Sequence, residues 1–124
     1  MNATTATAHV ADRVDATDDA IDALAAALAD PTRRGLLRLV RHDERSAGAL
    51  AEAFPGISRP AVSQHLRVLQ HAGLVEVRPD GNRRMYRARV QALAPVSRFI
   101  DEMWDDRLRR LKRAAEQLEN GGPS

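Results

Sequence analysis

The chain has 124 residues, of which 44% are hydrophobic and 3% aromatic, so it fits one globular domain with a mainly aliphatic core. It contains no cysteine, which excludes disulfide bonds, thiolate metal sites and thiol redox sensing. The net charge is +2, no apolar run reaches membrane-spanning length, and the N-terminus has no basic or apolar signal region. We therefore expect a cytoplasmic protein with no membrane partner.

The charge is unevenly distributed along the chain. Residues 1–30 hold six acidic residues and one arginine, whereas residues 57–90 hold seven arginines and two acidic residues. A contiguous basic stretch of this kind is typical of a surface that binds a polyanion, although a solvated arginine-rich surface would show the same composition.

Two helices are predicted in the first third of the chain. Residues 1–18 are rich in Ala, Thr and Asp without periodicity, which predicts a flexible tail. A helix is expected from Asp19, because Ile21, Leu24 and Leu28 repeat with helical spacing. Asp30 is then a suitable N-cap for a second helix, which Pro31 begins and which extends to about residue 41.

The next two helices form a predicted helix-turn-helix. Ser46 is expected to cap the third helix, which ends at the Pro-Gly pair 55–56. Ser58 is expected to cap the fourth helix by accepting a hydrogen bond from the Ala61 amide, and Gly73 to end it in a Schellman motif. The short turn between the two helices is typical of a helix-turn-helix.

After Gly73 the pattern changes to a β-hairpin and a last helix. Residues 74–78 and 83–89 read as strands, and the Pro-Asp-Gly-Asn sequence at 79–82 reads as their turn. A helix follows from about 92 to 120, with a break near Pro95, and residues 121–124 are expected to be disordered. The predicted fold is mainly α with a small β-hairpin, a winged helix-turn-helix spanning residues 19–120.

The outward face of the fourth helix carries the first candidate site. It contains no acidic residue between Ser58 and Gly73, and its Arg and Gln side chains match guanine and adenine edges in the major groove. The basic hairpin suits backbone or minor-groove contacts. An ordinary amphipathic surface helix is the alternative interpretation. The predicted contacts to double-stranded DNA are Ser58, Arg59, Pro60, Ser63, Gln64, Arg67, Arg83, Arg84 and Arg87.

Four ordered motifs carry a resemblance to a known family. They are ADPTRR at 29–34, SRPAVSQHLRVL at 58–69, AGLV at 72–75 and GNRRMY at 81–86. Together they resemble the arsenic-repressor (ArsR) family of winged-helix transcriptional regulators, over about residues 20–115. The resemblance implies a homodimer that represses transcription from a palindromic operator and dimerises through its first and last helices.

The last helix supports the same assembly from its own pattern. From Trp104 onward, apolar residues recur with nearly the spacing of a coiled-coil seam. A small domain has little surface with which to cover so long a helix, although packing on the chain's own core is the alternative. The predicted dimer contacts are Ile21, Leu24, Leu28, Phe99, Ile100, Met103, Trp104, Leu108 and Leu111.

The chain departs from the metal-sensing members of that family. Its third helix has no thiolate, its last helix has no histidine, and we predict neither a metal site nor a cofactor. It is closer to the cysteine-free members. Two other functions stay open: a sensor that responds to a metal or small-molecule effector, and a winged helix that binds a protein partner. Phosphate-binding loops and catalytic motifs are missing from the sequence, so we do not expect an enzyme.

Overall fold

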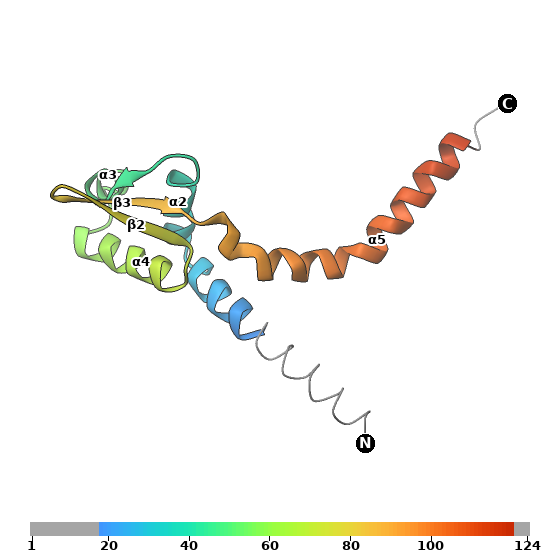
Figure 1. Cartoon of the computed structure of the whole chain (residues 1–124), viewed down its shortest axis with the longest axis horizontal. Coiled ribbons are helices and arrows are strands. Elements are labelled where there is room, and N and C mark those ends of the chain that lie inside the picture. Colours follow the sequence, from blue (N-terminus) through green and yellow to red (C-terminus); the bar gives the residue numbers. More distant parts are fainter. Residues whose placement is uncertain (1–17, 121–124) are drawn as a thin grey trace, which may run out of the picture. The chain divides into compact units, whose positions relative to one another are not determined.

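The computed structural model describes residues 18–120 (Figure 1). The predicted tail at 1–18, apart from Asp18, and the predicted C-terminal end at 121–124 lie outside the described residues, and the domain boundaries stay a prediction. The chain divides into two compact units, the first ending at Leu93 and the second beginning at Ala94.

The first unit has the predicted order of elements, with one short strand added. It contains a helix over residues 18–28, α2 (Pro31–Leu39), β1 (Arg45–Ser46), α3 (Ala47–Glu52), α4 (Arg59–His71), β2 (Val75–Asp80), β3 (Arg83–Ala88) and the 3-10 helix η1 (Val90–Leu93). The helix-turn-helix with its hairpin wing is therefore confirmed.

Three of its helices begin at the residues that the sequence predicted. The Asp30 carboxylate accepts hydrogen bonds from the amides of Thr32 and Arg33, at 2.8 and 3.2 Å. The Ser46 and Ser58 hydroxyls each accept one from the residue three positions later, at 3.1 and 3.3 Å. Each side chain satisfies amides that the first turn of a helix leaves without a partner.

The end of α4 fixes where the hairpin starts. Gly73 has φ +79°, the left-handed conformation that glycine adopts without a Cβ penalty. Its amide donates to the Gln70 carbonyl at 3.0 Å, and the Leu74 amide donates to the Leu69 carbonyl at 2.9 Å. These two bonds form a Schellman motif, and the buried Leu74 begins the hairpin immediately after it.

The hairpin turn is tighter than predicted. Asp80 pairs with Arg83 across the hairpin, so the turn consists of residues 81 and 82. Gly81 has φ +63° and Asn82 does not have a positive φ, which fits a type II′ turn. Pro79, expected in the turn, lies in β2, where proline is tolerated because β2 is an edge strand.

The sheet has three antiparallel strands in the order β1-β3-β2, where the sequence predicted two. In β1, Arg45 and Ser46 pair with Tyr86 and Met85. This strand was not predicted, because two residues are too few for a strand pattern to be visible in the sequence. The pairing ties the start of α3 to the base of the wing.

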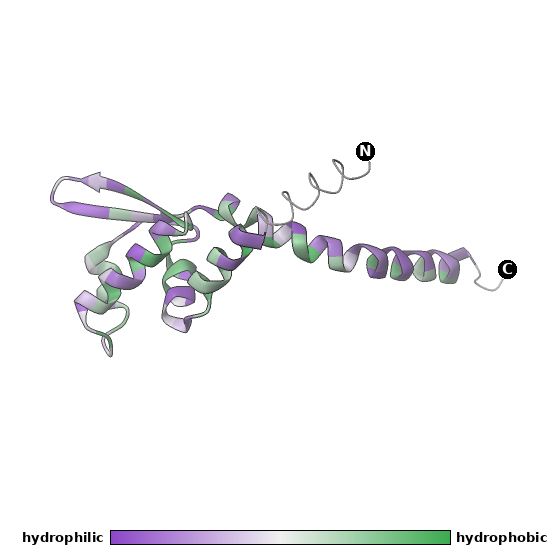
Figure 2. Ribbon diagram, turned by 90° about the horizontal axis from the view of Figure 1, so that it is seen from below, coloured by the Kyte–Doolittle hydropathy of each residue, from purple (hydrophilic) through white to green (hydrophobic). Residues whose placement is uncertain are grey.

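The core of the first unit is aliphatic apart from Tyr86, as the composition predicted. In α4 the buried side chains are Val62, Leu66 and Leu69, which lie on one stripe. Figure 2, a ribbon coloured by hydropathy, shows hydrophobic and hydrophilic residues alternating around the helices of this unit. The buried hydrophobic residues are Leu24, Ala27, Leu36, Val40, Leu50, Val62, Leu66, Leu69, Leu74, Val75 and Tyr86.

The second unit is a single long helix, α5 (Ala94–Asn120), with Pro95 in its first turn. None of its residues is buried in the chain. Among the described residues, no helix combines the length and the hydropathy needed to cross a membrane.

Candidate nucleic-acid interface

The predicted DNA-reading residues of α4 all lie on its exposed face. Val62 and Leu66 are buried, whereas Ser63 and Gln64 between them are exposed. The exposed set consists of Ser58, Arg59, Pro60, Ser63, Gln64 and Arg67. With no acidic residue on this helix, the face offers hydrogen-bond donors and positive charge without repulsion of phosphates.

Two of these side chains interact with each other. Arg67 Nη1 donates to Gln64 Oε1 over 3.5 Å, a long hydrogen bond between residues one turn apart. The contact uses the amide oxygen of Gln64 and leaves its amide NH₂ group free to donate. Reading adenine bidentately requires both groups, so Gln64 would release Arg67 on binding DNA.

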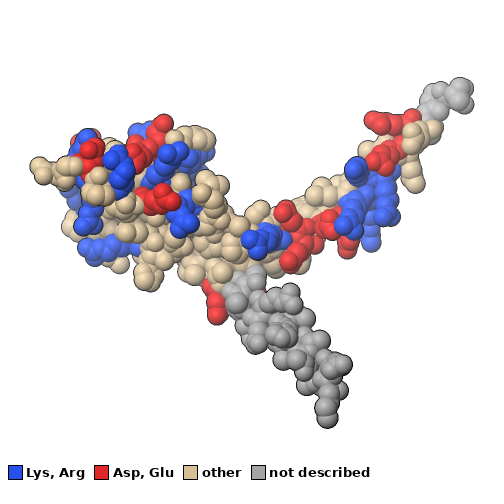
Figure 3. Space-filling model, viewed as in Figure 1, with Lys and Arg blue, Asp and Glu red and all other residues tan. Residues whose placement is uncertain are grey.

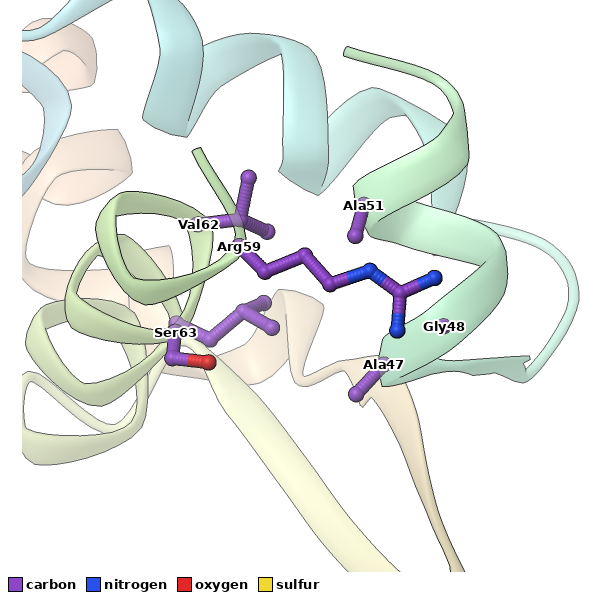
Figure 4. Close-up of a pocket in the computed structure, with 7 residues that line it drawn as sticks. Ala47, Gly48, Ala51, Arg59, Val62 and Ser63 are labelled. Carbon is purple, nitrogen blue, oxygen red and sulfur yellow. The ribbon is translucent and has the colours of Figure 1, made fainter. Parts of the chain in front are cut away.

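Arg59 points somewhere other than the sequence suggested. A hollow of about 130 Å³ opens between α3 and α4, lined by Ala47, Gly48, Ala51, Arg59, Val62, Ser63 and Leu66. The Arg59 side chain crosses this hollow, and its guanidinium lies beside Gly48 and Ala47 of α3 (Figure 4). A contact with guanine would require this side chain to swing out, whereas a contact with a phosphate near α3 would not.

The predicted wing arginines divide between the two faces of the hairpin. Side chains alternate along a strand, so Arg84 lies on the face of the buried Tyr86, while Arg83 and Arg87 lie on the other face with Met85. In Figure 1 the hairpin turn lies toward the same end of the unit as the start of α4. Arg84 is thus the wing arginine that lies close to the turn on the same face of the hairpin as Tyr86.

The outer face of the hairpin is partly neutralised by its own acids. Arg83 pairs with Asp80 at 3.4 Å and Arg89 with Glu76 at 3.2 Å. Figure 3 shows basic and acidic side chains mixed over this part of the molecule. No ion pair involves Arg84 or Arg87 within residues 18–120, so these two keep their full charge for a ligand.

One further ion pair secures the base of the wing. Arg78 donates to both carboxylate oxygens of Glu44, at 3.0 and 2.9 Å, joining β2 to the segment before β1. The hydrogen bond from Arg78 lowers the pKa of Glu44, with the charge of Arg87 adding to the effect. This pair was not predicted, because its members lie 34 residues apart and neither is on a periodic pattern.

The predicted dimer residues fall into two groups. In α5 all six are exposed, with 45% of Trp104 and 62% of Leu111 accessible in the single chain. In the helix over residues 18–28, Ile21 and Leu28 are partly exposed, but Leu24 is only 4% exposed. Leu24 therefore belongs to the core of the single chain rather than to a free surface, a correction to the sequence-based prediction.

The titratable side chains of the described region do not gather into a metal site. Between residues 18 and 120, no group of three or more His, Asp or Glu side chains is close enough to hold an ion. The four acids of α5 at 101–106 lie on a single exposed helix, where Asp105 is already paired with Arg109 at 3.0 Å.

Comparison with known proteins agrees with this geometry. Residues 28–78 match the family model of a helix-turn-helix domain. The chain is 46% identical over 78 residues to the HTH-type transcriptional regulator Rv2034 of Mycobacterium tuberculosis, covering 63% of this chain and 72% of that one. It is 43% identical over 49 residues to the transcriptional repressor SdpR of Bacillus subtilis, covering 40% and 53%.

A solved structure gives the same result. The homodimeric winged helix-turn-helix DNA-binding domain Mb0332 of Mycobacterium bovis, described as a possible ArsR-family regulator, superimposes with a TM-score of 0.60 at 32% identity, covering 77% of this chain and 87% of that one. Fold, helix-turn-helix and relatives together define a winged-helix transcriptional regulator. The chain belongs to the ArsR family of these regulators.

Proposed function

We propose that this regulator is a homodimeric repressor that binds an inverted-repeat operator, with α4 in the major groove and the hairpin against the flanking backbone or minor groove. The observation that carries the proposal is the exposed, acid-free face of α4, which the core does not use. A helix of this kind fits the major groove, and its first turns reach the base edges. Repression follows the relatives that are named repressors, and the cytoplasm is the expected location.

Separate roles are proposed for the two basic elements. Gln64 and Ser63 lie on the exposed face of α4 and would read bases, while Arg67 would contact phosphate. Arg84 would reach the minor groove or the backbone from the wing, and Arg59 a phosphate near α3. Arg83 is a weaker candidate for a DNA contact, because its guanidinium already forms an ion pair with Asp80.

A second copy of this chain is the proposed partner of α5. Its apolar stripe is uncovered in the single chain, and Arg107 stacks over the Trp104 ring at 5.9 Å. Burying such a stripe against an identical helix supplies the hydrophobic free energy that a stable dimer needs. Ile21 and Leu28, partly exposed on the helix over residues 18–28, would extend the contact.

The charges of α5 favour one orientation of that proposed pair. Residues 101–106 hold four acids, the acidic block, and residues 107–113 hold five bases, the basic block (Figure 3). A parallel pair would place like blocks together, whereas an antiparallel pair crossing near residue 107 places each acidic block beside a basic block. We therefore propose an antiparallel α5 pair.

A spin label tests this orientation cleanly, because the chain has no cysteine. With a label on Glu119→Cys, an antiparallel pair separates the two labels by about 35 Å along the helices, at about 1.5 Å per residue. A parallel pair keeps them within about 15 Å. A short distance, or no dimer at all, would refute this part of the proposal.

The DNA-binding function is tested by selecting bound duplexes from a randomised pool at physiological salt. We expect enrichment of an inverted repeat with half-sites about one helical turn apart. Arg67→Glu should abolish the enrichment, while Arg38→Glu, which makes the same charge change on the exposed side of α2, should preserve it. Absence of enrichment with the wild type would favour a protein partner for the winged helix instead.

A further inference from the structure

The side chain of Arg33 joins three parts of the first unit. Its Nε donates to the Ala27 carbonyl at 2.6 Å and its Nη2 to the Ala26 carbonyl at 2.9 Å. Its Nη1 lies 3.2 Å from Nδ1 of His65 on α4. All three guanidinium nitrogens therefore have a partner, and one residue of α2 connects the helix over residues 18–28 to the recognition helix.

The first two of these bonds close the end of a helix. The last turn of an α-helix leaves its carbonyls without intrahelical partners, and cationic donors there also oppose the helix dipole. Arg34 performs the same task beside Arg33, donating from Nη1 to the Leu28 carbonyl at 2.7 Å. Of the two, only Arg33 also has a hydrogen-bond contact with α4, so the two neighbouring arginines form a natural pair for comparison.

The third contact gives His65 the role of acceptor. A guanidinium only donates hydrogen bonds, so Nδ1 of His65 is the atom that accepts from Arg33 Nη1 in this contact.

His65 is well placed to control how α4 presents its outer face. Its neighbour Leu66 is buried, which holds the helix axis against the core, while its other neighbour Gln64 is exposed. A hydrogen bond at the flank between them restrains the rotation of α4 about its own axis. The direction of Gln64 therefore depends on a contact that lies away from the DNA-facing side.

We propose that Arg33 is a positioning residue for DNA recognition, which acts through His65 to fix the orientation of α4 relative to the helix over residues 18–28. This inference rests on the proposed function, because it assigns Arg33 a role in reading DNA by α4. It also makes Arg33 a link between DNA reading and the helix that carries the predicted dimer contacts Ile21 and Leu28.

The test measures affinity for the selected duplex and for random DNA. Arg33→Met removes the donors, His65→Leu removes the acceptor, and His65→Asn keeps an acceptor near the place of Nδ1. Arg34→Met is the matched control, because it removes a cap from the same helix end and breaks no hydrogen bond to α4. The dimer fraction of each variant is measured in parallel by sedimentation.

We expect Arg33→Met and His65→Leu each to weaken binding to the selected duplex about fivefold, and the double variant to be no weaker than either. His65→Asn and Arg34→Met should stay within about twofold of the wild type, with dimers intact.

Four outcomes would contradict this expectation. If Arg34→Met lost as much affinity as Arg33→Met, Arg33 would act only as a helix cap. If His65→Asn and His65→Leu lost equal affinity, the hydrogen bond between Arg33 and His65 would not be the cause of the loss. If the affinity losses of the two single variants multiplied in the double variant, Arg33 and His65 would act independently of each other. Loss of dimers in Arg33→Met would overturn the positioning role, and failure of the wild type to prefer the selected duplex would instead refute the proposed function itself.

Discussion

Gln64→Ala tests whether α4 reads bases in the way proposed. Gln64 is exposed, uncharged and without contact to the core, so its removal should leave the fold intact. A bidentate contact between Gln and adenine contributes about 1–3 kcal/mol of discrimination, which corresponds to about 5- to 150-fold in affinity per half-site. Because a dimer carries the substitution twice, the loss on a full operator should be the product of two such factors.

The assay is a titration of labelled duplexes by fluorescence anisotropy, at several salt concentrations. Gln64→Ala should have a lower affinity for the selected operator. At one position in each half-site, the variant should bind all four base pairs with the same affinity. The slope of log affinity against log salt should stay unchanged, because no charge is removed.

Arg84→Ala supplies the contrast. Arg84 is exposed near the turn of the hairpin and carries a full charge, so its replacement should weaken binding to all sequences alike. The salt slope should fall by about one for each phosphate that Arg84 neutralises. Equal, sequence-independent losses of affinity in both variants would show that Gln64 does not read bases, and that the face of α4 contributes charge and shape alone.

Three further outcomes follow from the structure. Gly73→Ala should lower the free energy of unfolding in urea by about 1–2 kcal/mol, because the φ of Gly73 is +79°. Gly56→Ala is the control: a Cβ meets no atom at either glycine, but Gly56 has no positive φ, so its replacement should be near neutral. Leu108→Glu places a charge on the uncovered stripe of α5 and should give folded monomers in sedimentation; persisting dimers would exclude this stripe from the interface. The pKa of Glu44 is lowered by the hydrogen bond from Arg78, so its stabilisation is complete above the ordinary value of 4.5 and is lost as pH falls through the lowered pKa. Thermal unfolding of Glu44→Gln should accordingly depend less on pH below 4.5 than that of the wild type, and parallel curves would contradict the assignment.

Local signals allowed much of the fold to be predicted. The cap residues Asp30, Ser46 and Ser58 were identifiable because each bonds to an amide two or three positions away, so the information lies within one turn of helix. Gly73 marked the end of α4 for the same reason. The buried stripe of α4 followed from spacing alone.

Contacts between distant segments escaped prediction. The strand β1 exists because Arg45 and Ser46 meet β3, some 40 residues later, and two residues carry no alternating pattern. The contact of Arg33 with His65 spans 32 residues and depends on the packing of α2 against α4. The burial of Leu24 likewise follows from tertiary packing, since a helical apolar repeat does not reveal whether its partner is the same chain or another.

The arginines of the hairpin and of α4 differ in whether an acidic side chain lies near them, and this difference distinguishes arginines that stabilise the fold from arginines that are available to bind a ligand. On the hairpin, Arg78, Arg83 and Arg89 each have a carboxylate partner within the chain, as expected where charge serves only solubility and local stability. On α4, folding requires only the buried stripe, and an acidic side chain four residues from Arg59 or Arg67 would stabilise the helix. No acidic residue is present on α4, so the helix lacks this stabilisation along its exposed face. Arg84, near the hairpin turn, also has no ion pair among the described residues. Contact with a polyanion requires uncompensated positive charge, which α4, Arg84 and Arg87 provide among the described residues. This distribution supports the proposal that α4 and the wing are the parts of the surface that meet DNA.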